Sequence, residues 1–458
     1  MKRIEKDYLG TMEIEEDALY GIHSLRASEN FPITKRGMDP ALIKNIALVK
    51  KACAMVNREH HDLDERKADA IISACDQIIE GKHLDSFIVD LIQGGAGTSA
   101  NMNANEVIAN LAIIESDGKA GQYELIDPLD DVNMHQSTND VIPTAARLTV
   151  MDKTKVLIES LRYLKEELDK KACQYEDVYR IGRTQLQDAV PMKASRSFEA
   201  YSSMVARSIV KIENVLKYMR HVNLGGTAIG SGIASNRYYH EHVIDRLSEL
   251  SGYELSRFYN LYDGTQNADD FASVSAEIRV CALSLSKMAS DIRLLSSGPL
   301  SGFREYNLPD KQSGSSIMPG KINPVIPEAL NQAAYLVIGN DVTVMMATEA
   351  GQLELNAFLP VLLFQLFESI DVLNNSVRTF TDNCIKDLIV IEDRCAYNVE
   401  HSASLAAALI PIIGYEKASA IVRKALERNE TIFAVAEEYG ISRKEIEDRL
   451  NPLDTPDE

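Results

Sequence analysis

The sequence predicts a mainly α protein built around a bundle of long helices, and three observations carry that prediction. Apolar residues recur at the three- and four-residue spacing of a helix face over four long stretches. The spacing persists beyond the length of an ordinary globular helix, which favours a bundle. Strand and helix patterns do not alternate along the chain, so a dinucleotide-binding sheet is not expected.

The four stretches differ in length but share one feature, a continuous apolar stripe with charged residues between its members. The fourth begins after Pro327, as expected for a helix that starts near a proline. The stripes are Leu157, Leu161, Leu164 and Leu168; Phe198, Tyr201, Val205, Ile209, Ile212, Leu216 and Met219; Ile278, Ala282, Leu285, Met288, Ile292 and Leu295; and Leu330, Ala334 and Val337, running toward Met345.

Short intervals rich in Gly, Ser, Thr and Asn separate these stretches, and they are the expected loops. Three of them stand out, at residues 93–105, 133–144 and 182–191. From about Asp393 the chain is expected to form a smaller helical unit, followed by an acidic tail at residues 451–458. The 458 residues are enough for about three domains.

Composition excludes several classes of partner. The net charge is −20, from 48 basic and 68 acidic residues, which disfavours nucleic acid and anionic membranes. The longest apolar run, near Leu405–Tyr415, is too short for a membrane span. The start of the chain lacks the apolar core of a signal peptide. Six dispersed cysteines without a C-x-x-C pair indicate free thiols, so a cytoplasmic protein is expected.

The segment Gly314–Pro324 carries the strongest chemical signal. Its two glycines and two prolines are typical of a loop. Within that frame lie the hydroxyls of Ser315 and Ser316, the ammonium of Lys321 and the amide of Asn323. These donors are suited to binding a carboxylate. We call residues 314–324 the signature loop.

This loop matches G-S-S-x-M-P-x-K-x-N-P, the signature of the fumarase/aspartase superfamily, at every fixed position, and the resemblance extends over nearly the whole chain. The family's members cleave C–N or C–O bonds and release fumarate. The resemblance implies a three-domain fold, with an N-terminal lyase domain at 1–138, a central long-helix domain at 139–393 and a small C-terminal helical domain at 394–458. It also implies a homotetramer with a twenty-helix core, in which each active site draws loops from three subunits.

Two glycine-rich segments admit nucleotide-binding alternatives. Gly94–Asn101 resembles a phosphate cradle but lacks the Gly-Lys-Ser/Thr ending, and it matches the aspartase form G-G-A-G-T-S-x-N-M-N-A-N-E, which includes Thr98 and Ser99. Gly226–Gly232 follows a helix rather than a strand, so a tight connection between helices is preferred there.

The segment His135–Asp140 places Ser137, Thr138 and Asn139 in a row, and the tripeptide Ser-Thr-Asn resembles the aspartase branch. Uncharged donors of this kind suit a carboxylate, and the same residue types favour a helix N-cap. Both interpretations can hold, because helix N-termini attract anions. His135 is the weaker candidate for an acid or base, since relatives do not require histidine there.

The segment Gly182–Pro191 contains Thr184 and Gln185. Many superfamily members carry histidine where this chain has Gln185, paired with a glutamate that matches Glu328. An amide orients a carboxylate but cannot transfer a proton near neutral pH. Ammonia leaving from an ammonium group needs no added proton, whereas hydroxide leaving from malate does. Gln185 therefore favours loss of ammonia over loss of water.

One segment departs from the family pattern. After Pro191 the family usually has Gly-Gln-Glu-Phe, whereas this chain reads Ser195-Arg196-Ser197-Phe198. An arginine thus replaces glutamine and a serine replaces glutamate at the expected helix start. If this turn reaches the site, substrate preference changes; if it faces a subunit contact, only packing changes.

The resemblance implies anti elimination of ammonia from L-aspartate through an aci-carboxylate, with Ser315 as the base. Thr98, Ser137, Thr138 and Ser316 would bind the β-carboxylate, and Asn139 would lie near the amine. Ser99 would also belong to the substrate-binding residues. Thr184, Gln185, Lys321 and Asn323 would hold the α-carboxylate, with Glu328 in support. No cofactor is required, although a divalent activator is possible. The alternatives are a class II fumarase, a lyase for a substituted aspartate, and a non-catalytic helical scaffold.

Other clusters of polar residues carry weaker signals. Asp127, Asp130 and Asp131 are expected to form a solvated acidic turn rather than a cation site. The histidines at 60–61 and at 240 and 242 lack neighbours at metal-ligand spacing, so no metal site is predicted.

Overall fold

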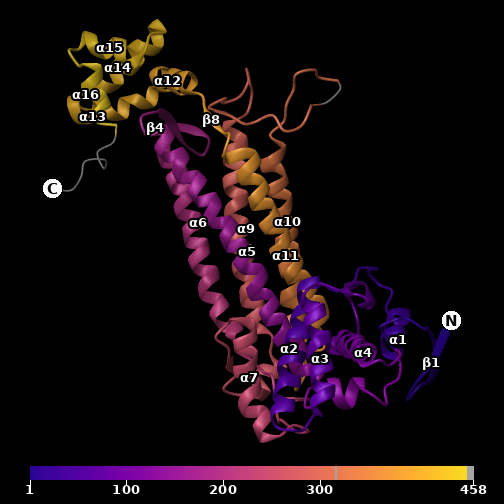
Figure 1. The fold of residues 1–458 in the computed structure, drawn as a ribbon. Coiled ribbons are helices and arrows are strands. Elements are labelled where there is room, and N and C mark those ends of the chain that lie inside the picture. The colour runs from indigo at the N-terminus through magenta and orange to yellow at the C-terminus, as the bar shows by residue number, and fades with distance from the viewer. Residues whose placement is uncertain (315–316, 451–458) are drawn as a thin grey trace. The chain divides into compact units, whose positions relative to one another are not determined.

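The structure, a computed structural model, describes residues 1–314 and 317–450 and is mainly helical (Figure 1). The four predicted stripes lie on α5 (Thr138–Gln174), α6 (Ser195–Val215), α9 (Asp269–Leu295) and α10 (Val325–Glu349), so the four helices are confirmed, although Met345 at the end of the fourth stripe is 59% exposed. Only Leu216 and Met219 fall beyond α6, in a short 3-10 helix at Leu216–Arg220. The longest helices among the described residues are α5 (Thr138–Gln174), α6 (Ser195–Val215), α9 (Asp269–Leu295), α10 (Val325–Glu349) and α11 (Leu359–Phe380).

The predicted loop intervals are partly wrong. Residues 98–105 belong to α4 (Thr98–Glu115), and residues 138–144 open α5. The interval 182–191 is a β-hairpin of β3 (Tyr179–Thr184) and β4 (Gln187–Lys193). The sequence of α4 misleads because its asparagines are buried, which removes the polar face that marks an amphipathic helix.

Two compact units divide the chain. Unit 1 contains residues 1–158, 210–280 and 335–372; unit 2 contains residues 159–209, 281–334 and the chain from residue 373 onward. This grouping follows the packing of the elements and does not test the domain boundaries at 138 and 393, which stay a prediction.

In unit 1, helix α2 (Pro40–Glu59) packs against α3 (Glu65–Ile79) and α7 (Arg237–Ser251), and α4 packs against α1 (Ile22–Asn30) and α3. Apolar side chains such as Ile46, Val56 and Ile71 are completely buried between them. The remaining elements are β1 (Lys2–Asp7) paired antiparallel with β2 (Gly10–Glu15), β5 (His221–Val222) paired parallel with β6 (Ser256–Arg257), and the helices α1 (Ile22–Asn30), α2 (Pro40–Glu59), α3 (Glu65–Ile79), α7 (Arg237–Ser251) and α8 (Leu261–Gln266).

The polar residues of α4 fix the loops around it. Asn103 accepts a hydrogen bond from the Ile88 amide and donates one to the Ser86 carbonyl. Glu106 is fully buried and accepts hydrogen bonds from the backbone amides of Gly21 and its neighbours at the start of α1. Such a carboxylate satisfies donors that a helix N-terminus leaves unpaired. The motif that follows Ser99 is therefore largely structural.

In unit 2, the C-terminal helices form their own apolar core, which also contains Ile181 from the hairpin. The segment from Glu392 to Glu447 is helical, as expected, while its status as a separate domain stays a prediction and the predicted tail at 451–458 lies outside the described residues. The elements are β7 (Tyr306–Asn307) paired antiparallel with β8 (Ile389–Val390), α12 (Glu392–His401), α13 (Ala406–Ile413), α14 (Tyr415–Arg428), α15 (Ile432–Glu438) and α16 (Arg443–Glu447).

Over residues 1–314 and 317–450, strands pair only in two-stranded sheets. This agrees with the prediction that the chain does not form a dinucleotide-binding sheet. In the same part of the chain, no helix combines the length and apolarity needed to cross a membrane.

Candidate functional site

The Ser-Thr-Asn turn, residues 137–139, opens helix α5 in unit 1. The Ser137 hydroxyl accepts a hydrogen bond from the Asn139 amide at 3.2 Å, and the Asp140 carboxylate accepts one from the Ser137 amide at 2.9 Å. These reciprocal bonds are an N-cap, so that interpretation is confirmed. The three side chains are half-buried at the positive end of a helix dipole. The position favours a bound carboxylate.

Asp140 holds this turn against a second segment of unit 1. Its other oxygen accepts hydrogen bonds from the backbone amides of Gly225 and Thr227, at 3.1 and 2.9 Å. The side chain is completely buried, and desolvation raises its pKa to about 6, although the three amides oppose the shift. Asp140 gives no signal of this role in the sequence, because Gly225 and Thr227 lie more than 80 residues away.

The side chain of Asn139 is also fixed by that segment. Its amide nitrogen donates to the Ala228 carbonyl at 2.7 Å, and its backbone carbonyl accepts from Asn223 at 2.9 Å. Because the amide nitrogen is engaged, the side-chain oxygen remains as an acceptor, which suits an ammonium group. The stretch 226–232 follows the two-residue strand β5 and leads to α7, so the predicted connection between two helices is wrong in its first partner, and the stretch also supports the turn.

A buried lysine lies behind the same turn. The Lys50 ammonium is inaccessible to solvent and donates to the side-chain oxygens of Asn133 and Gln136, at 3.3 and 3.1 Å. Burial lowers its pKa to about 8. His135 shares a hydrogen bond of 2.9 Å with the Asn57 side chain and is mostly buried, and this supports the view that it is structural rather than catalytic.

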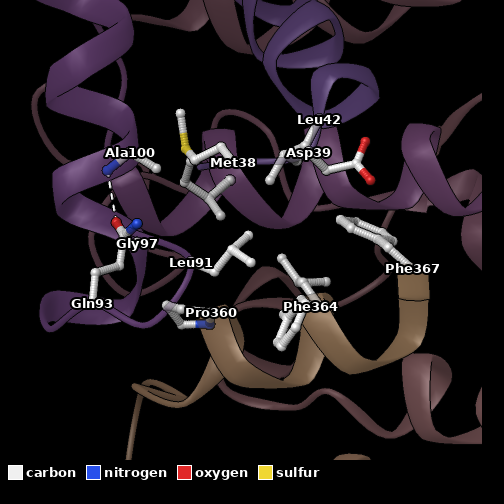
Figure 2. A pocket seen from close by; sticks show the side chains of 12 residues that line it. Met38, Asp39, Leu42, Leu91, Gln93, Gly97, Ala100, Pro360, Phe364 and Phe367 are labelled. Carbon is white, nitrogen blue, oxygen red and sulfur yellow. Dashed lines mark hydrogen bonds between the residues drawn. The ribbon is translucent and has the colours of Figure 1, made fainter. Parts of the chain in front are cut away.

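Thr98 and Ser99 form the first turn of α4. The Thr98 side chain is exposed and donates to the Gly95 carbonyl at 2.6 Å. Figure 2 shows how the Gln93 side chain reaches the start of this helix, where its oxygen accepts from the Ala100 amide at 2.7 Å. The hydroxyls of Thr98 and Ser99 therefore lie at the N-terminus of α4, and the Gln93 side chain stabilises that helix end.

The cavity beside this helix start is not the candidate site. It has a volume of about 40 Å³ and a mainly apolar lining that includes Met38, Leu91 and Phe364 (Figure 2). Pockets that bind small ligands usually have volumes of about 300 Å³ or more. A dicarboxylate does not fit.

In unit 2, the hairpin presents Thr184 and Gln185 to solvent at its tip. Gln185 and Leu186 form the two-residue turn with φ values of 52° and 63°. This left-handed conformation is the one that such hairpin turns require, usually from Asn-Gly. Two residues other than glycine there carry backbone strain, which proteins commonly retain at functional sites.

A buried carboxylate holds the hairpin in place. Glu305 is fully buried and accepts hydrogen bonds from Arg180 at 3.1 Å, Arg183 at 2.7 Å and Asn398 at 2.9 Å. Desolvation opposes ionisation, but the hydrogen bond and charge of Arg183, with Arg180, keep the pKa of Glu305 below its usual value. Asn398 belongs to α12, so the Thr184–Gln185 tip is braced by the C-terminal helices.

The signature loop leads into α10. Ser315 and Ser316 lie outside the described residues, whereas Lys321 and Asn323 are described and exposed. A Cβ atom at Gly314 would overlap the Lys321 carbonyl, so the two ends of the loop approach closely there. Glu328 lies in the first turn of α10.

Over the described ranges, no group of three or more His, Cys, Asp or Glu side chains is arranged to hold a metal ion. In the predicted acidic turn, Asp131 pairs with Lys67 at 2.7 Å, and Asp127 accepts hydrogen bonds from the amides of Leu129 and Asp130. These contacts account for two of the three carboxylates.

The predicted site residues thus fall into two sets. Unit 1 contains one set and unit 2 the other, and each set is exposed or half-buried within its own unit. The sets are Thr98, Ser99, Ser137, Thr138 and Asn139 in unit 1, and Thr184, Gln185, Lys321, Asn323 and Glu328 in unit 2.

Comparison with known proteins identifies the family. The chain matches a lyase family at residues 10–339 and the fumarase C C-terminus at residues 405–454. An aspartate ammonia-lyase from a Bacillus species is 45% identical over 453 residues, which cover 99% of this chain and 97% of the relative.

Two solved structures share the fold. The fumarate lyase:delta crystallin from Brucella melitensis bound to cobalt superposes with a TM-score of 0.95 at 45% identity and covers 99% of both chains. A class II fumarase from Schistosoma mansoni superposes with a TM-score of 0.93 at 29% identity and covers 100% of both. The chain therefore belongs to the fumarase/aspartase superfamily of lyases.

Proposed function

We propose that the chain is an aspartate ammonia-lyase, a carbon–nitrogen lyase that reversibly eliminates ammonia from L-aspartate to give fumarate. The observation that carries this proposal is the 45% identity to such an enzyme along 99% of the chain. The Ser-Thr-Asn turn and Gln185 support it. The amide nitrogen of Asn139 is engaged by the Ala228 carbonyl, which leaves its side-chain oxygen as an acceptor for an ammonium, and Gln185 supplies no proton that a hydroxide leaving group would need.

The difficult step is removal of a proton from C3, next to the β-carboxylate. In the proposed mechanism the Ser315 oxygen, as an alkoxide, takes this proton, and the electron pair spreads onto the β-carboxylate as an aci-carboxylate. Donors on Thr98, Ser137, Thr138 and Ser316 stabilise that charge, with Ser99 beside them. Each well-placed donor contributes roughly 3 kcal/mol by analogy with oxyanion holes. The C–N bond then breaks, the C=C bond forms, and neutral ammonia leaves.

The other end of the substrate needs positioning rather than chemistry. Thr184, Gln185, Lys321 and Asn323 are proposed to hold the α-carboxylate, and Asn139 to accept from the amine. Glu305 bonds to Arg183 of the hairpin and to Asn398 of α12. These contacts hold the hairpin that carries Thr184 and Gln185 in one orientation. The reaction needs no organic cofactor, and a divalent cation would act as an activator only.

A substrate panel tests the proposal. Ultraviolet absorbance of fumarate is followed with L-aspartate, malate, and N- or C-substituted aspartates as sole substrates. We expect L-aspartate to be the only compound of the panel that the protein converts to fumarate. Preference for malate indicates a class II fumarase, and preference for a substituted aspartate indicates the related lyase. No turnover of any of them, by a protein that stays folded, indicates the non-catalytic scaffold.

Replacing Lys321 with methionine is expected to raise KM for aspartate by about 30- to 100-fold, with a smaller effect on kcat. The loss of a charged hydrogen bond to the α-carboxylate costs about 2–3 kcal/mol, and it acts on ground state and transition state alike. Steady-state kinetics measure the effect. Lys311→Met, an exposed lysine outside the proposed site, is the matched control. An unchanged KM for Lys321→Met would remove this residue from the site.

The proposed homotetramer explains an unusual helix face. On α10, Tyr335, Val342, Met345 and Met346 are between 48% and 63% exposed, and they recur at helical spacing. An apolar stripe of this kind is costly in water and fits another helix. We assign it to a second copy of the chain, within a tetramer whose sites take loops from three subunits.

A double substitution tests this assembly. Val342→Glu with Met346→Glu places two charges on the stripe, and it is expected to reduce the mass measured by light scattering from four chains to fewer. Turnover should fall in parallel, because the sites are shared. Circular dichroism verifies that the helices remain. A wild-type chain with the mass of a monomer would contradict the assembly.

A further inference from the structure

Unit 2 contains a second cavity, beside the stem of the hairpin and the start of α6. Its volume is about 300 Å³, enough for a small organic acid. Four cationic side chains line it, against a single lining carboxylate. They are Arg180, Arg183, Arg196 and Lys287, with Asp291.

The two buried arginines of this cavity share one counter-charge. Arg180 and Arg183 both bond to Glu305, whereas Asp188 approaches Arg183 only at 3.6 Å and is half exposed. The second nitrogen of Arg180 donates to neutral atoms, the Ser197 hydroxyl at 3.2 Å and the sulfur of Met192 at 3.5 Å. A guanidinium is bound most strongly by a carboxylate. One nitrogen of Arg180 therefore has neutral partners where a carboxylate would bind more strongly.

At the mouth of the cavity, Arg196 pairs with Glu199 and Lys287 pairs with Asp291. Both cations are well exposed. Exposed pairs of this kind contribute little and exchange partners readily.

Ser197 stands at the position where the family pattern has glutamate. The exchange removes one negative charge beside Arg180 and shortens the side chain, and Ser197 lines the cavity. The buried hydroxyl of Tyr306, near Ser197, makes no hydrogen bond of standard geometry among the described residues. The cation of Arg180 and the open volume of the cavity thus meet at the position where the family pattern has a carboxylate.

We propose that this cavity binds a small dicarboxylate, one carboxylate of which replaces the missing side-chain carboxylate against Arg180. Its second carboxylate reaches Arg196 and Lys287 at the mouth. The cavity also touches Leu186, the neighbour of Gln185, so an occupied cavity stiffens the hairpin. This site does not depend on which reaction the enzyme catalyses.

The test uses Ser197→Glu, which supplies the carboxylate internally, and Ser197→Gln, which fills the same space without charge. Without ligand, Ser197→Glu is expected to melt a few degrees above Ser197→Gln, because only the former neutralises Arg180. Equal melting temperatures would show that Arg180 lacks no counter-charge and would overturn the proposal. Ser197→Glu is also expected to keep turning over aspartate.

Succinate, a dicarboxylate that cannot eliminate ammonia, serves as the probe. To suppress binding at the catalytic site, the comparison is made in the Lys321→Met background. Succinate is expected to raise the melting temperature of Lys321→Met by about 2 °C or more, relative to sodium chloride at equal ionic strength. It should leave Lys321→Met/Ser197→Glu unchanged. An equal rise in both proteins, or none in either, would overturn the proposal.

Discussion

Replacing Ser315 with alanine is expected to lower kcat by about 10³-fold, while fumarate still binds. General base catalysis contributes roughly 10²- to 10⁴-fold, and Ser315 is the residue proposed as that base, whereas the neighbouring Ser316 is proposed to bind the β-carboxylate. Single-turnover kinetics measure the chemical step, and equilibrium dialysis with fumarate measures binding.

Ser313→Ala is the matched control for this prediction. Ser313 lies two residues before Ser315, is exposed, and has no assigned role, so near-normal turnover is expected. Near-normal turnover of Ser315→Ala itself would exclude the serine base and with it the proposed mechanism.

Asp140→Asn is expected to lower kcat/KM by about 100-fold. The amide is nearly isosteric, but its nitrogen must face at least one of the three backbone amides that the carboxylate now accepts from. An unsatisfied or opposed donor in a buried position costs about 1–3 kcal/mol, and a turn displaced by about 1 Å loses about 100-fold in rate. Steady-state kinetics well below the melting temperature measure the effect.

The pH profile separates positioning from a merely structural role. Burial raises the pKa of Asp140 to about 6, so the wild type is expected to lose activity as pH falls through about 6, when the carboxyl takes up a proton and becomes a donor. Asp140→Asn should lack that acid limb. The charged or titratable groups facing Asp140 are Lys50 and Cys53 from α2 and Tyr239 from α7, and in wild-type protein they stay in one protonation state between pH 5 and 7.

The raised pKa of Asp140 affects the free energy of unfolding in the opposite direction to activity. The folded pKa of Asp140 lies above the value of about 4 for an unfolded aspartate, so the folded state binds the proton more tightly. Stability from this group is therefore present at low pH and declines as pH rises from about 4 to 6. Acid would inactivate the enzyme through Asp140 without unfolding it.

Asp270→Asn is the control for the substitution at Asp140. It breaks the ion pair of Asp270 with the buried Arg147, also within unit 1 but outside the Ser-Thr-Asn turn. The expected result is a lower melting temperature with unchanged kcat/KM and an unchanged acid limb. If both variants lose activity equally, Asp140 acts only through general stability.

The long helices were predictable from the sequence because their signal is local. Leu157 through Leu168 recur on one face, and burial of that face requires no knowledge of distant segments. The start of α4, residues 98–105, resembles a loop in sequence because its asparagines are buried and bond to residues outside the helix, as Asn103 does to Ser86. A window confined to the helix does not contain both sides of such a contact.

The candidate site divides in the same way. The signature loop, the Ser-Thr-Asn turn and Gln185 are visible as motifs, since their chemistry lies in adjacent residues. Asp140 appears in the sequence as an ordinary first-turn aspartate, and Glu305 as an ordinary glutamate, because their roles depend on which distant donors surround them. The left-handed backbone of Gln185 gave no signal, since glutamine is not a typical residue of such turns.

The tip of the β3–β4 hairpin has an evolutionary consequence. Its backbone already holds two ordinary side chains at positive φ, and histidine tolerates that conformation better than glutamine does. A single-base change converts a glutamine codon to a histidine codon, so the tip can gain or lose a proton-transferring ring while the stem stays intact. Given the role proposed for Gln185, enzymes on this scaffold are expected to diverge in leaving group by changing one exposed position.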